Sequence, residues 1–221
     1  MSHPSDPRLL VLHGLRIKGV AVPATVAETT GLAEAEVAEH LAALAGEGLV
    51  VERTGALVGW SLTAAGRDEH DRLVGDEVDA AGARPALRHA YEDFRALNGA
   101  ALDACSRWQV RDVEGRPVVN DHGDAGYDAD VVADLAEIER RAHPVCDDLA
   151  GTLDRYAGYG ERLHHAVERV EAGEGDWFTR PLIPSFHTVW FELHEDLITT
   201  LGIDRSDEAD PETETTPTGA S

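Results

Sequence analysis

Side chains that could bind a ligand gather late in the chain, as arginines, aromatic residues and histidines at helical spacing. Arg155, Tyr159 and Arg162 are four and three residues apart, so on a helix they share one face. Arginine pairs with carboxylates and aromatic rings supply an apolar wall, so this set could clamp an anionic aromatic or acyl ligand between helices. Three more residues complete the predicted effector pocket: His187, Trp190 and His194. In the alternative interpretation the arginines pair with nearby acids and the rings fill a core.

Neither the histidines nor the acids have the spacing of a metal or catalytic site. Zinc needs three or four converging ligands, but the chain has no HExxH motif, and the adjacent His164 and His165 cannot both point at one site. The nucleophile elbow GxSxG, the P-loop and a strand-linked GxGxxG are also missing. Cys105 and Cys146 form no CxxC pair and are expected to be buried apolar side chains. The sequence therefore predicts a protein that is not an enzyme and has no metal or cofactor.

The chain is strongly acidic, and its few basic residues are unevenly spread. The net charge is −23, and residues 1–74 carry six basic and ten acidic side chains, whereas the remaining residues carry 13 and 32. Because phosphate groups are neutralised by basic side chains, this balance argues against broad, non-specific binding to nucleic acid. If a part of the chain contacts DNA, it is the first third.

Hydrophobic spacing in that first third predicts three helices, two strands and a further helix. Thr63 is a suitable N-cap for the last of these helices. The earlier helices are expected at 9–17, 24–30 and 32–44, and the strands at 49–53 and 58–62. This order of elements is typical of a winged helix-turn-helix.

Two motifs in this region resemble the winged-helix domain of MarR-type bacterial transcriptional regulators. One is GLAEAEVAEHLAALAGEGLVVER, which begins at Gly31, and the other is WSLTAAGRDEH, which begins at Trp60. The resemblance covers residues 8–74, about a third of the chain, and implies a DNA-binding domain. Farther along, RLHHAVERV and SFHTVWFELHEDLITTLG resemble a helical segment of uncharacterised actinobacterial proteins with winged helices. A similar segment is attached to some pyruvate, phosphate dikinase-like chains, and this second resemblance implies no ligand.

In the MarR-type family, the start and outward face of the third helix contact base edges and phosphates. The matching residues here include Glu34, Ala35, Glu36, Glu39 and His40. Glutamate can accept a hydrogen bond from cytosine, but three glutamates with no arginine on that face are unfavourable beside phosphates. Phosphate contacts are therefore expected from the basic residues nearby: Arg16, Lys18, Arg53 and Arg67.

The rest of the chain is predicted to form long helices and an acidic tail. Amphipathic patterns with short links indicate an antiparallel helical bundle, with helices at 83–108, 131–156, 159–172 and 185–201. Pro144 should break or kink the second of these helices. Residues 111–130 are expected to be a loop with a short extended piece at Pro117–Val119. The tail, 204–221, is acidic and almost free of apolar residues, so disorder is expected.

These features predict a mainly α-helical protein with a winged helix-turn-helix domain at 1–74 and a dimerising or effector-binding helical bundle at 83–203. The expected function is that of a cytoplasmic transcriptional regulator that binds double-stranded DNA as a homodimer and responds to a small-molecule effector. The sequence shows no secretion signal, and no apolar run approaches the ~20 residues that span a bilayer. The alternative is an acidic protein-interaction adaptor that regulates a partner enzyme, with the winged helix as a docking surface.

Overall fold

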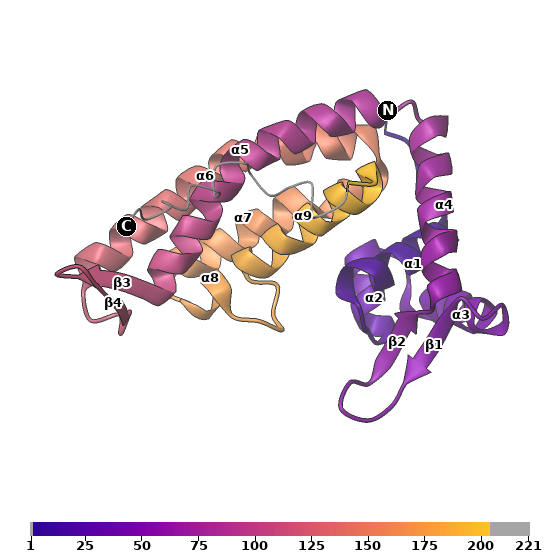
Figure 1. The fold of residues 1–221 in the computed structure, drawn as a ribbon, viewed down its shortest axis with the longest axis horizontal. Helices are drawn as coiled ribbons and strands as arrows, with labels where there is room; N and C mark the ends of the chain where they lie inside the picture. Colours follow the sequence, from indigo (N-terminus) through magenta and orange to yellow (C-terminus); the bar gives the residue numbers. More distant parts are fainter. Residues whose placement is uncertain (1, 204–221) are drawn as a thin grey trace, which may run out of the picture.

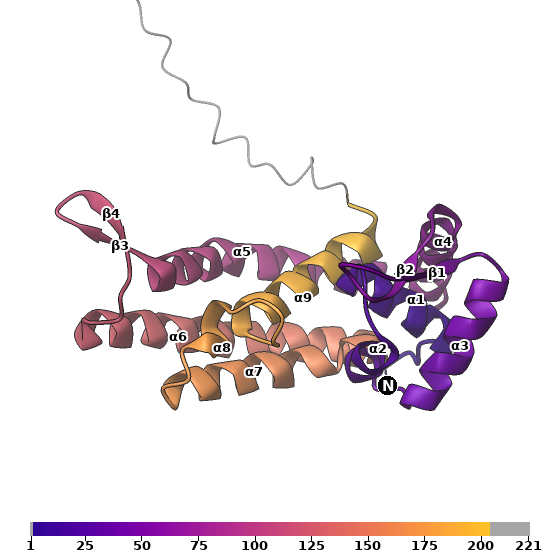
Figure 2. The ribbon, with the colours of Figure 1, turned by 90° about the horizontal axis from the view of Figure 1, so that it is seen from below.

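The computed structural model of the protein describes residues 2–203 and is mainly helical, with two small antiparallel hairpins (Figure 1). The predicted acidic tail, 204–221, lies outside the described residues. None of the described helices combines the length and apolar character needed to cross a lipid bilayer. We name residues 7–80 the N-terminal unit and residues 84–203 the C-terminal unit. The N-terminal unit lies at one end of the long helices of the C-terminal unit, and the second hairpin lies at the other end (Figures 1 and 2).

The N-terminal unit contains the elements that the sequence predicts, in the predicted order. They are α1 (Pro7–Lys18), α2 (Pro23–Thr30), α3 (Glu34–Gly46), β1 (Val50–Arg53), β2 (Gly59–Leu62) and α4 (Ala64–Ala80). The two strands pair antiparallel, with Val50 opposite Leu62 and Arg53 opposite Gly59. α4 runs on to Ala80, so the predicted domain end at residue 74 falls inside this helix.

The start of α4 is fixed by the Thr-x-x-Gly part of the second motif. The Thr63 hydroxyl accepts a hydrogen bond from the Gly66 N–H at 3.1 Å and so caps the helix, as predicted. A Cβ at Gly66 would lie 1.9 Å from the Leu49 carbonyl oxygen, a distance that no side chain can tolerate. Glycine therefore allows α4 to begin directly against the chain that enters β1. One apolar core lies beneath these elements and includes Leu12, Leu15, Val26, Val37, Leu41, Leu44, Val50 and Leu62.

The C-terminal unit consists of long helices that pack in a ring, in which the last helix contacts the first. Its elements are α5 (Arg84–Gln109), β3 (Val110–Val113), β4 (Arg116–Val119), α6 (Ala125–Thr152), the 3-10 helix η1 (Asp154–Tyr156), α7 (Gly158–Glu171), α8 (Asp176–Thr179) and α9 (Phe186–Leu201). α5 packs on α6, α6 on α7 and α7 on α9, and α9 returns to α5. The inward stripe predicted for the last helix is confirmed, since Phe186, Val189 and Leu193 are buried.

The prediction of a loop at 111–130 is wrong in part, because this stretch contains most of a β-hairpin and the start of α6. Glu114 and Gly115 both have positive φ, and together they form a two-residue turn between β3 and β4. The Asp112 carboxylate accepts a hydrogen bond from the Gly115 N–H at 2.7 Å. Asp124 then caps α6 by accepting from the Tyr127 N–H at 3.1 Å. Little in the sequence indicates this hairpin, for two reasons. Glu-Gly is a weaker turn signal than Asn-Gly, and the largely exposed strands lack the alternation of apolar and polar residues that indicates a half-buried strand.

Pro144 does not break its helix, which runs through it from Ala125 to Thr152. The proline and Arg140, whose carbonyl loses its helical donor, both lie on the exposed face of α6. Water can therefore bind that carbonyl. The buried neighbours Val145, Cys146 and Leu149 hold the helix against the core. Packing on one face thus outweighs the missing hydrogen bond on the other.

A second core fills the C-terminal unit and extends into the N-terminal unit. It includes Leu9 of α1 and Val74 and Val78 of α4, so the two units share apolar packing. Cys105 and Cys146 are both buried in this core, as predicted, and both are free thiols. Burial raises the pKa of both thiols to about 12, which makes them unreactive at neutral pH.

Candidate functional site

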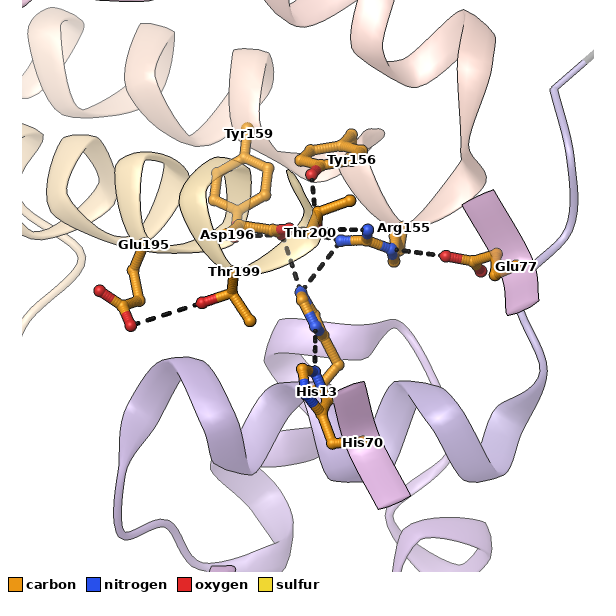
Figure 3. Close-up of polar contacts among 10 residues, drawn as sticks. All are labelled: His13, His70, Glu77, Arg155, Tyr156, Tyr159, Glu195, Asp196, Thr199 and Thr200. Carbon is orange, nitrogen blue, oxygen red and sulfur yellow. Dashed lines mark hydrogen bonds and ion pairs between the residues drawn. The ribbon is translucent and has the colours of Figure 1, made fainter. Parts of the chain in front are cut away.

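The most unusual group of side chains lies at the junction of the two units and is buried (Figure 3). α1 and α4 of the N-terminal unit face η1, α7 and α9 of the C-terminal unit there. The figure shows the His70 imidazole of α4 against that of His13, and the His13 imidazole of α1 pointing toward Asp196 of α9 and Arg155 of η1. The network contains His13, His70, Glu77, Arg155, Tyr156, Tyr159, Asp196 and Thr200.

Arg155 is the centre of this junction, with 2% of its side chain exposed. Its Nε donates to Glu77 Oε2 at 3.0 Å, Nη1 donates to Asp196 Oδ1, and Nη2 donates to Thr200 Oγ1 at 2.6 Å. Its guanidinium also lies over the Tyr156 ring, 4.5 Å from the centroid. Glu77 belongs to the N-terminal unit and Asp196 to the C-terminal unit, so one buried cation joins carboxylates from both.

Asp196 accepts hydrogen bonds from its own unit and faces His13 of the other unit. Tyr159 donates to Asp196 Oδ2 at 3.0 Å, and Thr200 donates to Oδ1 at 3.0 Å. Burial alone would raise the pKa of this carboxyl group, but the charges of Arg155 and His13 hold the pKa well below its usual range. Asp196 is therefore ionised throughout the neutral range, with its charge balanced inside the protein.

His13 and His70 form a chain of contacts across the junction. His70 Nε2 lies 3.0 Å from His13 Nδ1, and the two rings stack with centroids 5.3 Å apart. At the ends of the chain, His70 Nδ1 lies 2.9 Å from Asp71 Oδ1, and His13 Nε2 lies 2.9 Å from Asp196 Oδ2. Each of these three contacts needs one proton, but two neutral imidazoles carry only two. All three contacts become hydrogen bonds only when the pair holds one extra proton.

The burial of His70 sets the charge of its imidazole. Burial, and then the charge of His13, lower the pKa of His70 from 6.5 to about 4, so His70 is neutral at pH 7. His13 Nε2 lies between two groups of the C-terminal unit, because it is also 3.1 Å from Arg155 Nη1. A protonated Nε2 donates to Asp196, whereas an unprotonated Nε2 accepts from Arg155. In either form this nitrogen makes a hydrogen bond across the junction.

Two of the four basic residues predicted to contact phosphates are also drawn into this junction. Arg16 Nη1 lies 3.0 Å from Glu195 Oε1, and Lys18 Nζ pairs with Glu192 Oε1. Arg162 of α7 pairs with the other oxygen of Glu192. Acids of α9 therefore hold two cations of α1, so phosphate would have to compete with these acids.

The other two predicted phosphate contacts, Arg53 and Arg67, remain on the surface. Arg53 Nε donates to Ser61 Oγ at 2.9 Å, and Arg67 Nη1 donates to the Leu62 carbonyl at 3.4 Å. Within residues 2–203, neither arginine forms an ion pair. Together with Arg16 they line a cavity of about 580 Å³ between the end of α1, the β1–β2 hairpin and the start of α4. Three of the four basic residues thus surround one hollow.

The predicted base-contacting face of α3 is open to solvent. Glu34, Ala35 and Glu39 are exposed, whereas Glu36 and His40 are half-buried. Ala33 stands at the N-cap position and provides no side-chain cap. This face of α3 therefore carries small and acidic side chains, as its sequence indicates, and the basic residues predicted to contact phosphates lie in α1, the hairpin and α4.

The structure does not bring the six predicted effector-pocket residues together. Arg155 and Tyr159 are built into the buried junction, as in the alternative that assigned the arginines to acids. Trp190 stacks on Phe94, with ring centroids 4.6 Å apart, and its Nε1 donates to Asn98 Oδ1 at 2.9 Å. His194 also lies against Phe94. Arg162 and His187 alone share a cavity. Helical spacing placed each residue on a face but could not decide which neighbouring helix covered that face.

Sequence reasoning missed His13, His70, Glu77 and Asp196. His13 is the single polar residue in the apolar run LLVLHGL, and Asp196 follows the inward-facing Leu193 by three positions. These were the available signals, because a buried polar side chain needs a polar partner. Nothing in the sequence indicated that the partners lie in opposite units.

Comparison of this chain with protein-family models, with curated protein sequences and with solved structures gives no match. The function must therefore be inferred from the geometry of the chain itself.

Proposed function

We propose that the chain is a winged-helix transcriptional regulator that binds double-stranded DNA. The cavity beside the β1–β2 hairpin carries the proposal, because Arg16, Arg53 and Arg67 line it. Guanidinium groups bind phosphate oxygens through paired N–H donors. In a chain of net charge −23, a hollow lined by three arginines is suited to an anion such as a DNA phosphate. The element order of the N-terminal unit supports the same proposal.

In the proposed complex, α3 enters the major groove and the hairpin contacts the flanking backbone. Arg53 and Arg67 supply the phosphate contacts, and Glu34 or Glu39 accepts hydrogen bonds from cytosine. Because this surface offers few cations, affinity for arbitrary sequences is low. A second copy of the chain, bound to a second half-site, strengthens the complex by linking two weak contacts.

The C-terminal unit regulates this surface in our proposal. Glu195 holds Arg16, and Glu192 holds Lys18, so phosphate must compete with α9 for both cations. A signal that weakens the junction makes Arg16 and Lys18 available to DNA. The arrangement is a two-state equilibrium in which DNA favours the state with the junction loosened.

The test is selection of bound duplexes from the organism's fragmented DNA at about 50 and 150 mM salt, where phosphate contacts have a clear effect. We expect a discrete set of sites that persists at the higher salt. Arg53→Ala should weaken binding to all duplexes alike and reduce the salt slope by about one. Arg72→Ala is the matched control, because that exposed arginine of α4 already pairs with Glu69 and Asp76. Enrichment of no duplex at either salt would rule out the proposed function.

One observation favours a second candidate, an adaptor whose N-terminal unit binds another protein. The exposed face of α3 is made of alanines and glutamates, including Glu34, Ala35, Ala38, Glu39 and Ala42. Small side chains allow the backbone or a helix of a partner protein to approach closely. The glutamates can pair with basic side chains at the edge of that partner's surface.

A charge reversal on α3 separates the two candidates. Glu39→Arg should strengthen binding to arbitrary DNA if α3 lies against phosphates, because it removes a repulsion and adds an attraction. If α3 is a docking surface for a basic protein, the same variant loses that partner and leaves DNA affinity unchanged. Glu137→Arg is the control for a change in total charge, because Glu137 lies on the exposed face of α6 in the other unit.

A further inference from the structure

A cavity of about 840 Å³ lies between the two units, beside the buried junction. Its volume is within the range of pockets that hold small organic ligands. α1 and α2 form one wall, and α7, α9 and the segment 181–184 form the other. A ligand here would contact both units at once.

Two cations in the lining of the cavity share one buried carboxylate. Lys18 and Arg162 bind opposite oxygens of the single Glu192 carboxylate, whose side chain is only 5% exposed. His187 lines the same cavity. The other acid of the lining, Glu28, is exposed on α2, where water solvates its charge. The lining therefore contains two cations that share one carboxylate, and this carboxylate belongs to the protein itself.

The lining also includes apolar side chains. They are Ile17, Val20 and Ile183, together with Phe191, which is 47% exposed. Leu182 on the rim is fully exposed and has a φ of 69°. A leucine in the left-handed region is strained, and such strain is concentrated at ligand-binding sites. An apolar body placed here would cover surface that the chain leaves in water.

We propose that this cavity binds a small carboxylate with an apolar or aromatic body. The ligand's carboxylate takes the place of Glu192 between Lys18 and Arg162, and its body lies against Phe191 and Ile183. Of the residues predicted from sequence to form an effector pocket, Arg162 and His187 belong to this site.

Binding at this site alters a contact between the units. Lys18 belongs to α1 and Glu192 to α9, so a ligand that replaces Glu192 removes one ion pair that joins them. The regulatory consequence rests on the proposed function, since it matters only if DNA competes with α9 for the cations of α1. Binding of the carboxylate itself does not depend on DNA.

The experiment is isothermal titration of the full chain, without DNA, with phenylacetate and with its neutral and cationic analogues phenylacetamide and phenethylamine. We expect phenylacetate to bind at least about tenfold more tightly than either analogue, because an ion pair at a partly buried site contributes more than 1.4 kcal/mol. Arg162→Gln should remove this preference for the carboxylate. Arg140→Gln, which alters an exposed arginine of α6, should leave the preference unchanged.

Glu192→Gln provides the sharper test. If the ligand competes with Glu192, this variant should bind phenylacetate more tightly than the wild type does. Phe191→Ala, a change on the exposed rim that leaves the charges in place, should weaken binding of phenylacetate. The proposal is overturned if phenylacetamide binds as tightly as phenylacetate, if Glu192→Gln weakens binding, or if the folded wild-type chain binds no phenylacetate. Site-specific DNA binding by a chain that fails these tests would leave the proposed function standing and remove only the ligand site.

Discussion

The two sides of the N-terminal unit use their charged residues in opposite ways. On the side of α1 and α4 that faces the C-terminal unit, His13, His70 and Glu77 are buried and bound to partners. On the side of α3 and the hairpin, Glu39 and Arg53 are exposed, and neither forms an ion pair within the described residues. The inner side is thus committed to holding the two units together, whereas the outer side remains available for a ligand. The comparison explains why two of the four cations predicted to contact DNA are found at the junction instead.

The largest effect on stability is expected from removing Arg155, the buried cation of the inner side. Arg155→Met leaves Glu77 and Asp196 buried without their cation, which should lower the free energy of unfolding by about 3–5 kcal/mol. Chemical denaturation measures this change. Arg140→Met is the control, because its pair with Glu137 is exposed to solvent and contributes little to stability. A loss below about 1 kcal/mol for Arg155→Met would contradict the central role of this residue.

Acid should lower the stability of the protein through the buried His70 of the inner side. The unfolded chain protonates His70 below about pH 6.5, whereas the folded protein does so only below about pH 4. Between these values the unfolded state binds more protons, so the free energy of unfolding falls as the pH falls, by up to about 3 kcal/mol. Below this window, protonation of Asp196, whose folded pKa is lowered, removes further stability.

Urea denaturation at several pH values between 7 and 4 measures this dependence. His70→Gln removes the titrating group and should flatten the profile in that window. A profile of the wild type that is already flat, or that rises toward acid, would show that His70 is not held neutral by the fold.

The smallest effect is expected on the outer side, where α3 lacks a side-chain cap. Ala33→Ser places a hydroxyl at the N-cap position and should raise the free energy of unfolding by about 1 kcal/mol. Ala35→Ser, two residues into the same helix, should lower it by a few tenths to about 0.5 kcal/mol, since serine is a poorer helix former than alanine. Thermal melts of the two variants should therefore shift in opposite directions. Equal shifts would indicate that Ala33 does not occupy the N-cap position.

Local patterns predicted the elements of the N-terminal unit well, because each element depends on its own residues. Thr63 and Gly66 mark the start of α4, and the spacing of Val37, Leu41 and Leu44 defines the buried face of α3. Prediction from the sequence was less accurate where an element is stabilised by packing against other elements and not by its own residues. The β3–β4 hairpin has little apolar alternation, and α6 continues through Pro144 because the core supports its other face.

The sequence by itself determined the helical content, the order of strands and helices in the N-terminal unit, the burial of the two cysteines and the scarcity of cations. These properties follow from composition and from periods of two and 3.6 residues, which act over short distances along the chain. Only the tertiary structure decided which charges meet. Arg155 and Glu77 are 78 residues apart, and Arg16 and Glu195 are 179 apart. No local rule specifies such pairs, because they form only when the cores of both units have packed and brought α1, α4 and α9 into contact.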